Sequence, residues 1–254
     1  MHSDIVVFLG PTLGPLEAQN YLDAIYLPPV GGGDLVRAVI DHGPAAIVLI
    51  DGVFAQSPAV RHKEILWALA RGLRVYGAAS IGALRAAELS THGMVGHGLI
   101  YRWYRRTVLA DDSDVTVPMT PIEYGSQALG DALVDIRVTL RKAERQGIID
   151  RALRQALVQL ARSMHFSSRN FKSVFQRYLS SGGEAHMIEG LAAWVRGEHV
   201  SQKRRDAIDL LKHLASSKTS SDKIPRSANF ELTEAFAADM HDCNLFDYIL
   251  NEGT

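Results

Sequence analysis

The sequence lacks several features that define familiar classes of protein. Its 254 residues include a single cysteine, Cys243, which excludes an internal disulfide and a cysteine-rich zinc site and suits a reducing cytosol. No apolar run approaches the ~20 residues that span a bilayer. Asp4 interrupts the first apolar run and no basic region precedes it, so we expect no signal peptide and a cytoplasmic location.

The sequence also has almost no net charge and no nucleotide-binding motif. The net charge is −1, so we expect neither nucleic acid nor an anionic membrane as a partner. The glycine-rich segment at residues 10–14 does not fit G-x-G-x-x-G, and no P-loop sequence occurs, so we predict no nucleotide and no other cofactor. The acidic residues at 111–114 lack the spacing of a calcium loop, and no metal site is predicted.

The first ninety residues alternate between apolar strands and amphipathic helices. Strands are predicted at residues 5–9, 24–27, 46–50 and 74–76, and helices at 16–23, 34–42, from Pro58 to Gly72, and at 81–89. Apolar runs that do not alternate with polar residues are typical of strands that are buried on both faces. The pattern predicts an α/β fold, a Rossmann-like and mostly parallel sheet with helices on both faces.

The remainder of the chain reads mainly as helix. A last strand is predicted at residues 115–117, followed by helices at 121–146, 149–163, 168–179, 184–196, 201–214 and 230–250. The predicted organisation is an α/β core domain at 1–120, a helical region at 121–215, a linker at 216–229 and a C-terminal helix at 230–254. The aromatic and basic stretch at 99–107 precedes the acidic cluster, so we expect it to form an ion-paired scaffold segment.

In an open parallel sheet, ligands bind beyond the carboxyl ends of the strands. Four glycine- or proline-rich segments follow the predicted strands, at residues 10–14, 28–34, 51–56 and 77–82. They contain Gly10, Thr12, Asp34, Asp51 and Ser80. Such loops present unpaired N–H groups that suit an anion, so we expect these four segments to line one cleft.

Ser80 lies where a strand turns sharply into a helix. The sequence AASIG at residues 78–82 has the small-x-Ser-x-Gly form of a nucleophile elbow. Serine is also a common helix cap, so the pattern fits either a nucleophile or a residue that only begins the helix.

Four further polar residues have both a functional and a structural interpretation. His62 opens a predicted helix and could act as a base, or be a surface or capping histidine. Lys63 and Glu64 could face the cleft or form a solvated pair. Arg85 could hold a bound carboxylate or form an ion pair with Glu88 at i, i+3.

Five motifs together resemble the TfuA family. They are FLGPTL at 8–13, IDGVF at 50–54, VRHKEIL at 60–66, YGAASIGALRAAEL at 76–89 and GMVG at 93–96, in the family's order. The resemblance covers about the first 120 residues and leaves out the helical C-terminal half. The family often has Ser-Ser-Met where this chain has Ala79, Ser80 and Ile81, so the second serine is the one retained here.

The resemblance implies a role in backbone thioamidation beside a YcaO enzyme, which activates a peptide amide with ATP. TfuA proteins are thought to help deliver the sulfur, by acting on a thiocarboxylated, ubiquitin-like sulfur carrier. We therefore predict Ser80 as nucleophile, His62 as base and Asp51 as the residue that orients His62. The predicted substrate-binding residues are Gly10, Thr12, Asp34, Lys63, Glu64, Gly82 and Arg85, with N–H groups near Gly10 and Gly82 stabilising the oxyanion.

Two function classes stay open at this point. One is a hydrolase-like enzyme that releases sulfide for a peptide or protein substrate. The other is an adaptor without catalytic activity that docks on the YcaO enzyme. In both, Cys243 is expected to be a poor carrier of sulfur.

Overall fold

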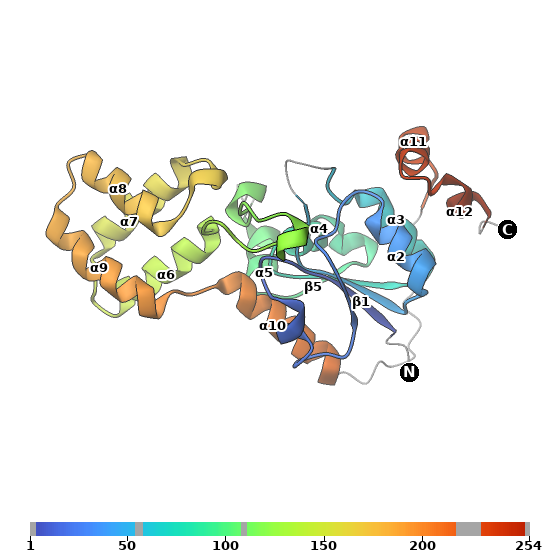
Figure 1. Ribbon diagram of the computed structural model, residues 1–254, viewed down its shortest axis with the longest axis horizontal. Coiled ribbons are helices and arrows are strands. Elements are labelled where there is room, and N and C mark those ends of the chain that lie inside the picture. The colour runs from blue at the N-terminus through green and yellow to red at the C-terminus, as the bar shows by residue number, and fades with distance from the viewer. Residues whose placement is uncertain (1–3, 54–57, 108–110, 217–229, 252–254) are drawn as a thin grey trace. The chain divides into compact units, whose positions relative to one another are not determined.

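A computed structural model describes residues 4–53, 58–107, 111–216 and 230–251 (Figure 1). The chain divides into two compact units. One contains residues 1–108 and 206–254 and is called here the α/β unit; the other, the helical unit, contains residues 109–205. The four-part domain organisation stays a prediction, because residues 217–229 of its linker lie outside the described residues.

The α/β unit is built on one parallel sheet of five strands in the order β2-β1-β3-β4-β5. The strands are β1 (Ile5–Phe8), β2 (Ile25–Leu27), β3 (Ala46–Leu49), β4 (Arg74–Gly77) and β5 (Val95–Gly96). Phe8 pairs with Leu49, and Leu49 pairs with Gly77, so β1, β3 and β4 end level with one another. The prediction of neighbouring parallel strands at 5–9, 46–50 and 74–76 is confirmed.

The predicted last strand was wrong. Residues 115–117 form no strand, and the fifth strand is β5, which has two residues, too few for a periodic signal. The Val115 carbonyl accepts a hydrogen bond from Lys203 Nζ, and the Thr116 hydroxyl donates to the Asp112 carbonyl. The Val115 carbonyl is thus bonded to a side chain and not to a neighbouring strand.

Helices cover both faces of the sheet, as the sequence predicts. Val6, Phe8, Ile47, Leu49 and Val75 pack against α2 (Asp34–His42) and α3 (His62–Ala70). Val7 and Val48 of the strands, with Leu9 and Ile50 just after them, pack against α10 (Gln202–Ser216), which lies on the opposite face (Figure 1). Burial on both faces explains the unbroken apolar character of β1 and β3.

Several helix boundaries differ from the prediction. Helix α3 begins at His62 and not at Pro58, because Pro58 and Ala59 pair as extended backbone with the loop at Gly31 and Gly32. The first helix, α1 (Pro15–Ala18), is shorter than predicted, whereas α2 has the predicted bounds. Helix α4 (Ile81–Leu89) follows Ser80, and α5 (Gly98–Arg106) covers the aromatic and basic stretch.

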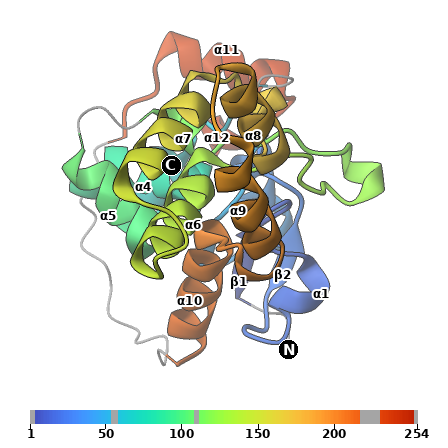
Figure 2. The ribbon, with the colours of Figure 1, turned by 90° about the vertical axis from the view of Figure 1, so that its left-hand side faces the viewer.

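The helical unit has a core of its own, formed by four helices and the short turns between them (Figure 2). They are α6 (Leu133–Arg145), α7 (Arg151–Ser163), α8 (Phe171–Ser180) and α9 (Ala185–Glu198). Helix α6 begins later than the predicted residue 121, because residues 118–129 form a turn in which Met119 bridges Ala128. No helix among the described residues has the length and apolarity to cross a membrane.

The C-terminal segment is two helices, α11 (Glu234–Asp242) and α12 (Phe246–Asn251), and not the single helix predicted. Asn244 has a φ of 57° and ends the first helix. Phe236, Met240 and Leu245 are buried in the same core as α2 and α3. The segment is therefore part of the α/β unit.

Candidate functional site

The predicted site residues Gly10, Asp51 and Ser80 lie together at the carboxyl edge of the sheet. They directly follow β1, β3 and β4, which are neighbours and end level with one another. The Gly10 N–H donates to Asp51 Oδ2 at 3.0 Å, and the Gly82 N–H donates to the Ile50 carbonyl at 3.4 Å. Three of the four predicted segments thus meet at one edge of the sheet, whereas the prediction that all four line one cleft stays a prediction.

Asp51 is buried and holds the loop after β1. Its Oδ2 accepts from the N–H groups of Gly10 and Thr12, and its Oδ1 accepts from the Thr12 hydroxyl at 2.6 Å. Three hydrogen bonds to one carboxylate fix its position. Asp51 thus orders the loop that carries Gly10 and Thr12.

Ser80 lies in a strained turn at the end of β4. Ala79 has a φ of +67°, which a residue with a Cβ rarely adopts, and the Ser80 N–H donates to the Ala78 carbonyl at 2.8 Å. Ser80 is the residue before α4, yet its side chain makes no capping hydrogen bond to the helix. Its hydroxyl is therefore not used in the way that the capping interpretation requires.

The start of α4 lies very close to the sheet. A Cβ on Gly82 would lie 1.8 Å from the Leu49 carbonyl oxygen, and one on Gly77 would lie 2.0 Å from the Gly82 oxygen. Glycine is required at both positions, because any side chain would push the helix off the strands. The N–H groups of Gly82 and Gly10 are both bonded within the protein, so neither is a preformed oxyanion donor in this structure.

His62 contacts Glu88 and not the predicted partner Asp51. Its Nε2 lies 2.8 Å from Glu88 Oε2, and this is the imidazole's hydrogen bond within the described part of the chain. Since an α-helix rises about 1.5 Å per residue, Glu88 lies roughly 12 Å along α4 from Ser80. The structure therefore brings His62 to neither Asp51 nor Ser80.

Arg85 belongs to the same cluster. It forms the ion pair with Glu88 that the sequence offered as one of two interpretations. Its Nη1 lies 2.7 Å from Glu88 Oε2, and its Nε donates to the Val60 carbonyl. Burial alone would raise the pKa of the Glu88 carboxyl, but the hydrogen bonds from His62 and Arg85 outweigh it and hold that pKa below its usual value. The cluster ties α4 to the start of α3.

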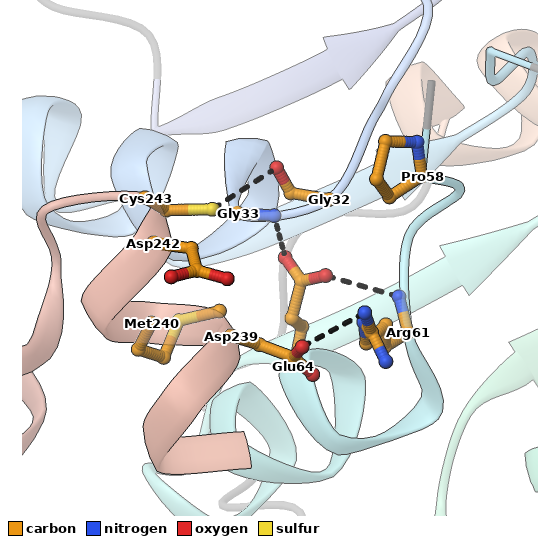
Figure 3. A pocket seen from close by; sticks show the side chains of 9 residues that line it. All are labelled: Gly32, Gly33, Pro58, Arg61, Glu64, Asp239, Met240, Asp242 and Cys243. Atoms are coloured by element: carbon orange, nitrogen blue, oxygen red, sulfur yellow. Dashed lines mark hydrogen bonds and ion pairs between the residues drawn. The ribbon is translucent and has the colours of Figure 1, made fainter. Parts of the chain in front are cut away.

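Glu64 is fully buried and not part of a solvated pair. Its Oε2 accepts from the Gly33 N–H and its Oε1 from the Arg61 N–H, both at 3.0 Å (Figure 3). Burial raises the pKa of Glu64 to about 7, although the two backbone hydrogen bonds favour the carboxylate. One carboxyl thus joins the N-terminal ends of α2 and α3.

The C-terminal segment covers the neighbouring predicted residues. Lys63 Nζ donates to the Glu231 carbonyl, and Arg61 forms an ion pair with Asp239 at 2.8 Å. Asp34 Oδ2 accepts from the Gly31 N–H at 2.8 Å and so stabilises the loop before α2. Lys63, Glu64 and Asp34 therefore lie apart from the Ser80 turn, on the side of the fold that α11 covers.

The sequence did not predict a pocket that lies beside Glu64 and Arg61. It has a volume of about 90 Å³ and is lined by Gly32, Gly33, Pro58, Arg61, Glu64, Asp239, Met240, Asp242 and Cys243 (Figure 3). Cys243 Sγ lies 3.7 Å from the Gly32 carbonyl oxygen, and burial together with Glu64 raises the pKa of its thiol. A side chain on Gly33 would collide with this sulfur, so Gly33 and Cys243 fit one another closely, but no sequence pattern connects them.

No group of three or more His, Cys, Asp or Glu side chains within the described ranges is arranged to hold a metal ion.

The model of the TfuA-like protein family matches residues 51–170. Residues 51–170 of this chain are thus similar to the TfuA-like family. The matched stretch contains Asp51, His62, Ser80 and the acidic cluster, and extends through α6 and α7.

The match corrects the extent of the resemblance. It begins after the motif at 8–13 and includes part of the helical unit, where the sequence showed no likeness. A comparison with curated proteins found no match. The similarity to the TfuA-like family suggests a role in the YcaO-associated thioamidation system.

Proposed function

We propose that this TfuA-like protein releases sulfide from a thiocarboxylated, ubiquitin-like carrier for a YcaO enzyme that thioamidates a peptide or protein. The observation that carries the proposal is the Ser80 turn. Ser80 follows Ala79, whose backbone is strained, at the end of a strand. Its hydroxyl does not cap the helix that follows. The turn lies within the stretch that matches a family linked to thioamidation. Strain of this kind costs roughly 1–3 kcal/mol and is concentrated at functional sites.

The proposed reaction has two balanced steps. The Ser80 oxygen attacks the thiocarboxylate carbon and forms an ester as the C–S bond breaks, and a base passes the hydroxyl proton to the departing sulfur, which leaves as hydrosulfide. Water then hydrolyses the ester, which restores Ser80 and leaves a carboxylate on the carrier. Peptide N–H groups at the beginning of α4 are the proposed donors to the oxyanion, once the bound tail displaces the weak contact of Gly82 with Ile50.

Asp51, Thr12 and Gly10 are proposed to form the wall of the binding cleft next to Ser80. Asp51 supports this role by ordering the loop, and not by orienting His62. His62 stays the predicted base, and it could reach Ser80 only by leaving Glu88. Asp34, Lys63, Glu64, Gly82 and Arg85 stay predicted binding residues.

The adaptor function is the second candidate, and one observation favours it. The predicted nucleophile and base, Ser80 and His62, form no pair in the described residues, because His62 is bonded to Glu88. An adaptor needs no such pair, since the YcaO enzyme would supply all the chemistry.

Incubation of the purified protein with a thiocarboxylated carrier, in the absence of any YcaO enzyme, separates the two functions. The sulfide-releasing enzyme should produce free sulfide and carrier carboxylate in equal amounts, which methylene blue formation and mass spectrometry measure. An adaptor should leave the thiocarboxylate intact at the rate seen in buffer alone.

A further inference from the structure

The C-terminal segment at residues 230–251 lies against the N-terminal ends of α2 and α3 (Figure 3). A Cβ on Gly33, just before α2, would lie 2.7 Å from Cys243 Sγ. Lys63 of α3 donates from Nζ to the Glu231 carbonyl at 2.9 Å. These helices follow β2 and β3, so their first residues lie at the edge of the sheet where ligands bind. The segment is called here the C-terminal cover.

The polar contacts at the rim of the C-terminal cover are exposed to solvent. Arg61 Nη2 lies 2.8 Å from Asp239 Oδ1, and half of the Arg61 side chain is exposed. Arg37 Nη2 donates to the Cys243 carbonyl at 3.0 Å, also at the surface. Solvent-exposed ion pairs contribute little to stability. The rim therefore holds the cover weakly.

Apolar burial holds the centre of the cover, but this contact is interrupted. Phe236 and Met240 of α11 are each 1% exposed and pack in the core that contains α2 and α3. Beside Met240 lies the pocket of about 90 Å³, which Glu64 and Asp242 also line (Figure 3). Atoms that line a pocket lack van der Waals partners on one side, so the pocket weakens the attachment of the cover.

The two helices of the cover depend on this attachment for their own structure. Helix α11 has nine residues and α12 has six. Isolated helices shorter than about 12 residues are marginal in water, so neither should persist once it leaves the core. The described strands of the sheet all lie between residues 5 and 96, outside the cover. The cover can therefore unfold while the sheet stays intact.

We propose that residues 230–251 form an autoinhibitory cover, which opens by local unfolding and admits an acidic ligand to the pocket beside Glu64. The closed cover binds Lys63 and forms one wall of the pocket that Glu64 lines. Opening releases Arg37, Arg61 and Lys63 from their oxygen partners, so these cations become available to acidic groups. A role of Lys63 and Glu64 in binding the carrier rests on the proposed function, whereas the opening does not.

Cys243 reports on the opening, because it lines the pocket and is the single cysteine of the chain. Its labelling with a maleimide is followed by mass spectrometry in the full-length protein at one fixed pH. Met240→Ala weakens the cover. Met94→Ala is the matched control, because Met94 is 2% exposed in the same core but packs against Gly77 beside β5.

We expect the wild type to be labelled at least about thirtyfold more slowly than the urea-unfolded chain. Met240→Ala should speed up labelling at least about tenfold, and Met94→Ala should leave the rate within about twofold of the wild type. Urea below the unfolding transition gives a second measurement, on the wild type alone. Local opening exposes less surface than unfolding of the whole α/β unit, so the logarithm of the labelling rate should rise with urea at under half the slope of global unfolding.

Equal acceleration by the two variants would overturn the proposal, as would a urea slope equal to that of global unfolding, because the cover would then open only with the sheet. Labelling of the wild type at the rate of the unfolded chain would show that the cover is not closed. Met240→Ala should also release sulfide faster than the wild type, and equal rates would overturn the autoinhibitory role. No release by either protein would contradict the proposed function alone, because labelling decides the opening.

Discussion

Burial of the Glu64 carboxyl links the stability of the α/β unit to pH. The pKa of Glu64 is raised to about 7 by burial, so the folded state retains this proton at pH values where the unfolded chain has lost it. Stability from this group is present at low pH and falls as the pH rises through that range. The total loss is roughly 3 kcal/mol.

Glu64→Gln should remove this pH dependence, because the amide does not ionise. Urea unfolding between about pH 5 and pH 8 should show the wild-type protein losing more stability than the variant as the pH rises. Glu189→Gln, at an exposed position on α9, controls for the loss of one surface charge. Parallel pH profiles for wild type and Glu64→Gln would show that the carboxyl is ionised throughout this range.

The position of α4 against the sheet depends on the single residue Gly82. Gly82 lies against the backbone of Leu49, and a Cβ there would be 1.8 Å from a carbonyl oxygen. The clash is with backbone atoms that cannot move without disturbing β3. Substitution should therefore displace the turn that carries Ser80.

Gly82→Ala is expected to lower the melting temperature of the α/β unit, although alanine favours a helix by about 1 kcal/mol over glycine. Gly190→Ala is the matched control, because Gly190 is also inside a helix and has open space around its Cβ position. That variant should melt at or above the wild-type temperature by circular dichroism. Equal stability of Gly82→Ala and wild type would contradict the close packing of α4 on β3.

For the whole molecule, the absence of a P-loop or dinucleotide motif predicts that ATP is used by the YcaO enzyme and not by this chain. Calorimetry with the isolated protein should show no micromolar binding of ATP with magnesium. Heat of binding that saturates in that range would contradict the prediction and would require a nucleotide site outside the known motifs.

The α/β architecture could be predicted because strands buried in a parallel sheet consist of unbroken apolar residues, such as Val6, Val7 and Phe8. Tertiary contacts could not be read in the same way. Nothing near Cys243 in the sequence indicates that it lies beside Gly32, and the pairing of His62 with Glu88 depends on how α3 lies along α4. Ser80 could be found because its turn is local to the sequence.

The most direct test of the account measures sulfide release from a thiocarboxylated carrier by Ser80→Ala, without a YcaO enzyme. Loss of a nucleophile should lower the rate at least about a hundredfold. Because the hydroxyl makes no capping bond, the fold should be retained, which circular dichroism checks. Ser90→Ala, at the other end of α4, should release sulfide at the wild-type rate. A normal rate in Ser80→Ala would contradict the catalytic role of this serine and favour the adaptor.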